Sequence, residues 1–183
     1  MTNLAWNVER VLPSAIADLH RLISIPSISS MPEHDADVAA CADVVSGLFR
    51  DLGASEVKLL DGGGKPAVWA NFPGPEGTPT VLLYAHYDVQ PTGDVDAWTS
   101  PAFEPTERGG RLYARGSADD KGGVALHVAA LRVFDGKPPV GVKVFIEGEE
   151  EIGSPTMPTL LDRYRDELAA DVYVVADSVN WEV

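Results

Sequence analysis

The sequence is poor in cysteine, in basic side chains and in long hydrophobic runs, and each shortage excludes a class of protein. Its single cysteine, Cys41, leaves no intrachain disulfide possible, and we expect a buried thiol because the surrounding run 38–42 is apolar. The 14 Lys and Arg residues stand against 28 Asp and Glu, a net charge of -14. That balance argues against a nucleic-acid partner, since phosphate binding needs a basic face.

Hydrophobic runs are too short to span a membrane, and the N-terminus has neither the basic nor the apolar region of a signal peptide. We therefore expect no membrane partner and a cytoplasmic location. The remaining composition is ordinary, with 45% hydrophobic and 23% charged residues in a chain of 183, enough for one domain with a sizeable core. Most of the acidity favours solubility, and a smaller share is available to surround a cation.

Helical and strand patterns alternate along the chain. Apolar residues at helical spacing predict a helix over 8–23, in which Pro13 suits the first turn better than the middle. Further helices are expected over 35–52, 122–134 and 157–168, and strands over 57–60, 67–70, 80–84, 142–146 and 172–175. The run 80–84 is apolar throughout, as expected of a strand buried on both faces. This alternation predicts an α/β layer fold with a largely parallel sheet.

Polar clusters follow four of the predicted strands, at the strand ends where ligands gather in open α/β sheets. In the first cluster, His86 and Asp88 are two residues apart and point the same way in an extended chain. A carboxylate in that position can hold the imidazole of a metal ligand. Taken alone, the pair is more typical of a histidine that is hydrogen-bonded in a turn.

Carboxylates make up the other three clusters. Asp119 and Asp120 precede a predicted helix, where they either cap it or bridge two cations. The run 147–151 contains four glutamates, which form a solvated charge run if exposed or need a divalent cation if packed at a strand end. One of them could act as a general base. Asp177 follows the last strand and by itself resembles an ordinary turn residue.

The four clusters together point to a metal site, because the alternative requires four separate coincidences at strand ends. Nitrogen and oxygen ligands without thiolate suit Zn²⁺ or Mn²⁺ at a catalytic centre.

Three motifs carry a resemblance to a known family: Tyr-Ala-His-Tyr-Asp-Val-Gln-Pro at 84–91, Gly-Ser-Ala-Asp-Asp-Lys-Gly at 116–122 and Glu-Glu-Glu-Ile-Gly-Ser at 149–154. The sequence resembles the di-zinc peptidases that include carnosinase, cysteinylglycine dipeptidase, aminoacylase, glutamate carboxypeptidase, acetylornithine deacetylase and succinyl-diaminopimelate desuccinylase. The first two motifs most resemble the dipeptidase branch. The resemblance implies a three-layer αβα, zinc-exopeptidase-like fold, of which residues 1–183 form the incomplete, N-terminal segment of the catalytic domain.

The resemblance also implies a set of ligands for two Zn²⁺ ions, with Mn²⁺ or Co²⁺ as possible replacements. By this resemblance His86 and Asp177 bind one zinc, Asp119 bridges both, and Glu151 binds the second. The Asp119–Asp120 peptide is expected to be cis, as it typically is in the family.

Two further residues are the candidate catalytic groups. The resemblance makes Glu150 the general base, and places Asp88 behind His86 to hold its ring. Glu149 is a third candidate for the roles given to Glu150 and Glu151.

Family members are considerably longer than this chain. In them a lid or dimerisation domain interrupts the catalytic domain, and the returning chain supplies a last histidine to the second zinc. The remaining histidines, His20, His34 and His127, do not occupy that position and are expected to be structural or exposed. We therefore expect a second site without its usual histidine, a segment that is inactive or nearly so alone, and a possible homodimer of the full-length protein.

The favoured function is hydrolysis of a peptide bond in dipeptides or small peptides by a two-zinc-activated water with a glutamate base. One alternative is an N-acyl-amino-acid deacylase on the same site. Another is a non-catalytic acidic module that binds metal or a partner protein. A plain α/β module without metal predicts that His86, Asp119, Glu151 and Asp177 do not converge.

Overall fold

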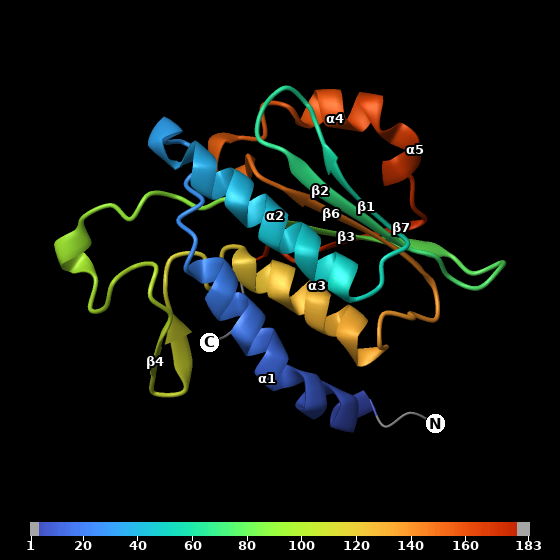
Figure 1. Cartoon of the computed structure of the whole chain (residues 1–183), viewed down its shortest axis with the longest axis horizontal. Coiled ribbons are helices and arrows are strands. Elements are labelled where there is room, and N and C mark those ends of the chain that lie inside the picture. The colour runs from blue at the N-terminus through green and yellow to red at the C-terminus, as the bar shows by residue number, and fades with distance from the viewer. Residues whose placement is uncertain (1–3, 179–183) are drawn as a thin grey trace.

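The computed structural model describes residues 4–178, in which a five-stranded sheet lies between two layers of helices (Figure 1). One face of the sheet is covered by α2 (Asp35–Asp51) and α3 (Lys121–Val133), with α1 (Leu4–Ile23) packed outside them against α3. The other face is covered by α4 (Met157–Arg163) and α5 (Arg165–Leu168). The α/β fold and its three layers are as predicted.

The sheet is mixed, with the strand order β1-β2-β6-β3-β7. Its strands are β1 (Glu56–Leu60), β2 (Ala67–Phe72), β3 (Thr80–His86), β6 (Gly141–Glu147) and β7 (Val172–Val175). The pairs β6–β3 and β3–β7 are parallel, whereas β1–β2 and β2–β6 are antiparallel. The parallel part therefore brings the carboxyl ends of β3, β6 and β7 to one edge of the sheet.

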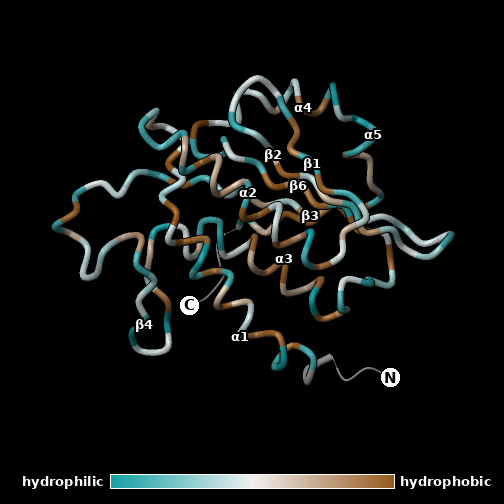
Figure 2. Tube along the Cα trace, viewed as in Figure 1, coloured by the Kyte–Doolittle hydropathy of each residue, from teal (hydrophilic) through white to brown (hydrophobic). Residues whose placement is uncertain are grey.

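Alternating side chains of the strands divide the core into two parts. Val68, Ala70 and Phe72 of β2 face the helices α1 to α3, while Ala67 and Trp69 face α4 and α5. Figure 2 shows hydrophobic colouring along the central strands and along stretches of the helices. Cys41 lies in the first of these cores and is fully buried, as expected.

Three details differ from the sequence prediction. Pro13 lies inside α1 rather than in its first turn. Residues 12–14 are exposed, so water can bond to the carbonyl that proline leaves without a donor. The predicted helix 157–168 is divided at Tyr164, whose φ of -115° interrupts it. A small hairpin of β4 (Thr106–Arg108) and β5 (Arg111–Tyr113) was not predicted, because three-residue strands are too short to show a period.

β3 is less deeply buried than its apolar sequence suggests. Leu82 and Ala85 are buried, but Val81 and Leu83 are only partly so. The neighbouring strand β7 forms the edge of the sheet, and all four of its residues are exposed.

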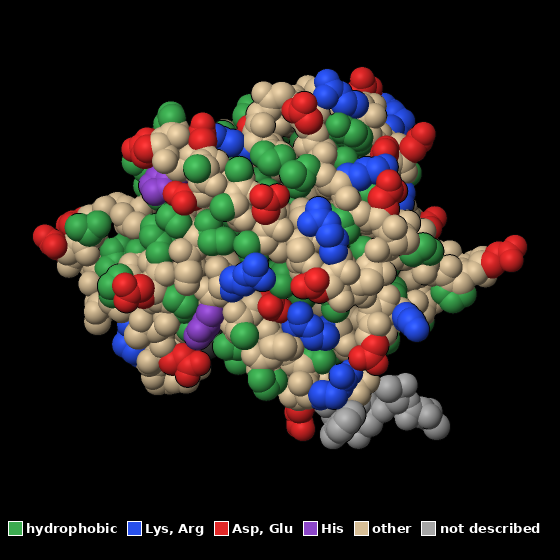
Figure 3. Space-filling model, in the orientation of Figure 1, with side chains coloured by type: hydrophobic (Ala, Val, Ile, Leu, Met, Phe, Trp, Pro, Cys, Tyr) green, Lys and Arg blue, Asp and Glu red, His purple; other side chains and the backbone are tan. Residues whose placement is uncertain are grey.

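Acidic side chains are scattered over the face that carries α1 to α3, interspersed with Lys and Arg (Figure 3). This distribution fits a solvating role for much of the net charge of -14. Among residues 4–178, no helix combines the length and the apolar character that crossing a membrane requires.

His127 joins α3 to the central strand. Its side chain is buried, and Nε2 donates a hydrogen bond to the main-chain oxygen of Tyr84 at 2.9 Å. Burial lowers the pKa of His127 below its ordinary value of 6.5, although the hydrogen bond opposes the shift.

We predict that His127 makes the metal-free chain less stable as the pH falls below about 6.5. The unfolded chain takes up the proton at 6.5, whereas the folded chain takes it up only at lower pH, so stability is lost as the pH falls through this window and is unaffected above it. The measurement is the free energy of unfolding in urea between pH 5 and pH 8, for the unchanged chain and for His127→Gln. A difference between the two that does not vary with pH would contradict the prediction.

Candidate metal centre

Three elements place ligands at the carboxyl edge of the parallel strands. His86 ends β3, Glu150 begins the 3-10 turn η3 (Glu150–Ile152) after β6, and Asp177 follows β7. One ligand atom from each of these residues lies within 4.8 Å of the others. Nε2 of His86 is 3.8 Å from Oε2 of Glu150 and 3.8 Å from Oδ2 of Asp177. Two carboxylates from distant parts of the chain therefore approach one imidazole nitrogen.

The two adjacent aspartates before α3 have different positions. Asp120 is buried and caps the helix, accepting from the amide of Gly123 at 3.1 Å and from the amide of His86 at 3.1 Å. Asp119 has a side chain that is 65% exposed, and its Oδ1 lies 3.0 Å from Nε2 of His86. The peptide between them is cis, as the resemblance implied. Each of the two interpretations therefore applies to a different residue. Asp120 caps the helix, and Asp119 faces the site.

His86 is held through its other ring nitrogen. Nδ1 lies 3.1 Å from the main-chain oxygen of Asp88 and 3.3 Å from its Oδ1. A carbonyl oxygen can only accept, so Nδ1 carries a hydrogen and Nε2 is the nitrogen available to a cation. The predicted pairing is present, with the hydrogen bond made to the carbonyl of Asp88 and the carboxylate close beside it.

Neighbouring negative charge makes His86 basic. Burial alone would lower the pKa of the imidazole, but the hydrogen-bonded Asp88 and the charges of Asp120 and Glu150 outweigh it and raise the pKa to about 10. Without a metal the ring therefore carries a proton at neutral pH, and a cation must displace that proton to bind.

Asp88 also holds the turn that carries two of the glutamates. Its side chain is fully buried, Oδ1 accepts from the amide of Glu150 at 3.2 Å, and Oδ2 accepts from the amide of Glu151 at 3.1 Å. Oδ2 also accepts from the hydroxyl of Ser29 at 2.6 Å. Sequence reasoning missed Ser29, because a serine in the run Ile-Ser-Ser gives no local signal of what it contacts.

The acidic run after β6 divides into supporting and site residues. Glu149 is only 5% exposed, and its carboxylate accepts from the amide of Lys65 at 2.9 Å and from the hydroxyl of Thr156. Glu147 accepts from the hydroxyl of Tyr84. Both carboxylates have partners outside the cluster, so the geometry favours Glu150 over Glu149 as the candidate base.

Two of the four predicted ligands lie outside the cluster. Asp119 is next to it, because its Oδ1 approaches the same His86 nitrogen at 3.0 Å. Glu151 is turned toward Gln90: its Oε2 accepts from the side-chain amide of Gln90 at 2.7 Å, and Gln90 also donates to the main-chain oxygen of Glu151. The predicted set therefore converges only in part, with Asp119 and Asp177 each close to His86.

The surroundings of Glu150 suit a group that exchanges a proton. Burial raises the pKa of its carboxyl, the positive charge of His86 lowers it, and the charges of Asp177 and Glu151 raise it. The net direction is upward, toward the operating pH at which a general base is most effective.

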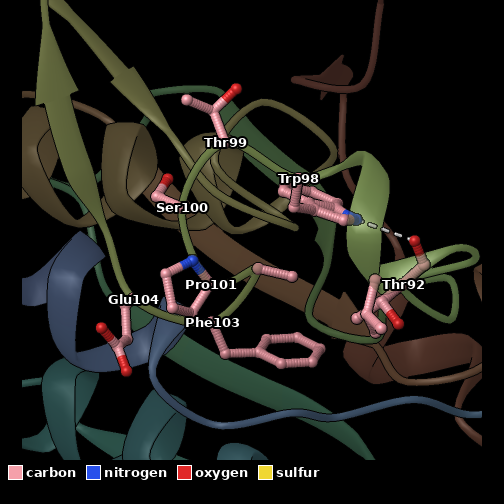
Figure 4. A pocket seen from close by; sticks show the side chains of 9 residues that line it. Thr92, Trp98, Thr99, Ser100, Pro101, Phe103 and Glu104 are labelled. Atoms are coloured by element: carbon pink, nitrogen blue, oxygen red, sulfur yellow. Dashed lines mark hydrogen bonds between the residues drawn. The ribbon is translucent and has the colours of Figure 1, made fainter.

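A pocket lies in the loop that leaves the site after Gln90 (Figure 4). The indole of Trp98 donates to the main-chain oxygen of Thr92 at 2.9 Å, and the guanidinium of Arg115 lies 5.6 Å from the Trp98 ring centroid. Pro101 and Phe103 line the same hollow. None of the predicted ligands lines it, so this pocket is not the candidate reaction centre.

The other histidines have contacts elsewhere. His34 pairs with Asp37 at 2.6 Å, His127 binds Tyr84, and His20 lies on α1. None of them belongs to the cluster found among the described residues.

We predict that alanine at two adjacent glutamates affects stability to very different extents. Glu149→Ala should lower the free energy of unfolding of the metal-free chain by about 2 kcal/mol, because it leaves the Lys65 amide and the Thr156 hydroxyl without their acceptor. Glu150→Ala should change it by no more than about 0.5 kcal/mol, since that side chain is partly exposed among like charges. Urea unfolding of both variants is the measurement. Equal destabilisation would show that the two roles are not separated as described.

Comparisons with known proteins identify the family to which the chain belongs. The profile of peptidase family M20/M25/M40 matches residues 82–182. Over 181 residues the chain is 37% identical to a cysteinylglycine-S-conjugate dipeptidase from Corynebacterium striatum, covering 97% of this chain and 39% of that relative.

Two solved structures share the fold over nearly the whole chain. The di-peptidase Dug1p from Saccharomyces cerevisiae superposes with a TM-score of 0.89 at 25% identity, covering 97% of this chain and 41% of that one. Human carnosine dipeptidase 1 superposes with a TM-score of 0.88 at 27% identity, with the same coverage of 97% and 41%. The chain thus spans about two fifths of the length of these relatives. With a family profile over more than half of its residues and a relative aligned along nearly all of them, the chain belongs to peptidase family M20/M25/M40.

Proposed function

We propose that this chain supplies the amino-terminal part of the active site of a metal-dependent dipeptidase. The single observation that carries the proposal is the approach of Glu150 and Asp177 to Nε2 of His86, with one nitrogen or oxygen atom of each of the three side chains within 4.8 Å of the others. The membership of the family and the names of the similar proteins support the class of reaction.

The donor set fits a divalent cation of the zinc type. It combines one imidazole nitrogen with carboxylate oxygens and contains no thiolate, and the imidazole presents Nε2 while Nδ1 is held by Asp88. We assign His86, Asp119 and Asp177 to one ion, and Asp119 with Glu151 to a second. Zn²⁺ is the favoured metal, and Mn²⁺ or Co²⁺ would accept the same donors.

A bound divalent ion would polarise the scissile carbonyl and lower the pKa of an adjacent water. In the proposed reaction Glu150 takes the proton from the attacking water and later returns it to the departing amine, so the carboxyl ends the cycle as it began. Asp88 keeps the imidazole of His86 oriented and fixes the backbone from which Glu150 projects. The raised pKa of Glu150 supports this double role.

The proposed substrates are dipeptides and small peptides. The similar proteins are a cysteinylglycine-S-conjugate dipeptidase, a di-peptidase and a carnosine dipeptidase, and we extend this substrate class to the longer protein to which such a segment would belong. We also propose a cytoplasmic location, with which the buried thiol of Cys41 is compatible, and a homodimer for the full-length protein. An N-acyl-amino-acid deacylase on the same residues is the competing proposal, and acylated amino acids belong in the substrate panel for that reason.

We predict that the purified 183-residue chain binds Zn²⁺ and Co²⁺ and that two substitutions separate ligand from base. His86→Ala should weaken binding by more than about a hundredfold, because it removes a ligand rather than a group behind one. Glu150→Gln should weaken it by less than about tenfold, since the base is not required to hold the ion. Isothermal calorimetry with Zn²⁺ and the visible spectrum of Co²⁺ give the affinities. Failure of the unchanged chain to bind either ion would overturn the proposed function, and a hundredfold loss in Glu150→Gln would make Glu150 a ligand.

We predict that Glu150→Gln in a full-length protein carrying this segment lowers kcat for dipeptides by about 10²–10⁴-fold, because the proton transfers lose their carrier. The measurement is turnover of a panel of dipeptides and acylated amino acids with Zn²⁺ or Mn²⁺ added. Glu149→Gln is the matched control, since it alters a neighbouring carboxylate outside the cluster and should leave kcat within about threefold of the unchanged protein at a temperature where both are folded. Faster turnover of acylated amino acids than of dipeptides would favour the deacylase.

A further inference from the structure

The segment that follows α1 lies directly against the candidate metal centre. Residues 27–29 run parallel to residues 87–89, with an isolated bridge between Ile28 and Val89 and a hydrogen bond from the amide of Val89 to the oxygen of Ser27 at 3.0 Å. The hydroxyl of Ser27 donates to the main-chain oxygen of Tyr87 at 2.7 Å. The main-chain pairing with Val89 fixes the register of the segment relative to the residues that follow β3, including Asp88.

A buried lysine binds the chain just before this segment. Lys121 is fully buried, and its ammonium donates to the main-chain oxygens of Leu22 at 2.9 Å and of Ile25 at 2.6 Å. These carbonyls lie at the end of α1, where a positive charge is favourable. Lys121 directly follows the Asp119–Asp120 pair, and residues 87–89 directly follow His86. Both groups of residues that hold the segment are therefore neighbours of candidate site residues in the sequence.

Ser29 is the last residue of this segment, and its hydroxyl contacts the carboxylate of Asp88. Ser29 is 5% exposed, and Oγ donates to Oδ2 of Asp88 at 2.6 Å. The same carboxylate faces Nδ1 of His86 and accepts from the amides of Glu150 and Glu151. The hydroxyl of Ser29 therefore restrains the rotation of the Asp88 carboxylate. Both the imidazole of His86 and the turn that carries Glu150 and Glu151 contact this carboxylate.

We propose that Ser29 is a positioning residue of the metal centre, acting through Asp88 to orient His86 and the turn that carries Glu150 and Glu151. The proposal rests on the function proposed above, because it concerns the same site. Without the hydroxyl, the carboxylate of Asp88 keeps the amides of Glu150 and Glu151 as donors but loses its shortest hydrogen bond, so it is held less firmly beside the imidazole. Metal affinity falls although no ligand has been removed.

The experiment measures Co²⁺ and Zn²⁺ affinity, and the visible spectrum of bound Co²⁺, for the whole chain and for two serine variants. Ser29→Ala should lose about tenfold or more in affinity, in the range known for groups behind the ligands, with an altered Co²⁺ spectrum. Ser27→Ala is the matched control. It also removes one buried serine hydroxyl from the same segment, but its partner is the main-chain oxygen of Tyr87 rather than Asp88. We expect its affinity to stay within about threefold of the unchanged chain, outside the range for metal-supporting groups.

A second pair of variants tests the hydroxyl at constant volume. Ser29→Thr keeps the donor and Ser29→Val replaces it with a methyl group of the same shape, so the ratio of their affinities reports the hydrogen bond even if the alanine variant does not fold. A double-mutant cycle with Asp88→Asn should show that the two effects are not additive, because Ser29 acts through that carboxylate.

The outcomes separate this inference from the proposed function. If the unchanged chain binds metal and Ser29→Ala binds as well as Ser27→Ala, the role of Ser29 is overturned and the metal centre stands. Equal affinities of the Thr and Val variants, or additive effects with Asp88→Asn, would overturn it as well. If the unchanged chain binds neither ion, the metal centre itself is wrong and the inference falls with it.

Discussion

The buried carboxylate of Asp88 is the interaction on which the rest of the site depends. A charge that is fully removed from water is tolerated only when its oxygens are paired, and here the pairing comes from the hydroxyl of Ser29, the amides of Glu150 and Glu151, and the ring of His86. Satisfying this one group draws two distant parts of the chain, at Ser29 and at the turn of Glu150 and Glu151, to the end of β3. The same contacts that pair the buried charge of Asp88 therefore also assemble the candidate metal centre.

The sheet supplies the frame within which that pairing is possible. Because β6, β3 and β7 are parallel and in register, the residues after them emerge at one edge, with His86 opposite Glu147 and Tyr84 opposite Val175. Asp120 then ties the amide of His86 to the start of α3, which brings the carboxylate of Asp119 to the same edge. The helices on both faces of the sheet pack against these strands and hold their ends in place.

The acidic run after β6 shows how burial gives neighbouring, chemically identical side chains different roles. Glu147 and Glu149 are buried and take hydrogen bonds from Tyr84, Lys65 and Thr156, so they support the strand end and the turns around it. Glu150 is left partly exposed beside His86, where burial and like charges raise its pKa. Proximity in the sequence is therefore a poor guide to function within this run.

The sequence by itself determined the α/β class, the main helices and strands, the buried Cys41 and the polar side chains that follow β3, β6 and β7, because hydrophobic period and strand-end polarity are local signals. The motifs also identified the family. Tertiary structure decided that β1 and β2 pair antiparallel, that Asp120 caps while Asp119 faces His86, and which glutamate approaches the imidazole. It alone revealed Ser29, whose partner Asp88 is 59 residues away. Strand order, burial and long-range hydrogen bonds arise from packing between distant segments, and no local pattern encodes them.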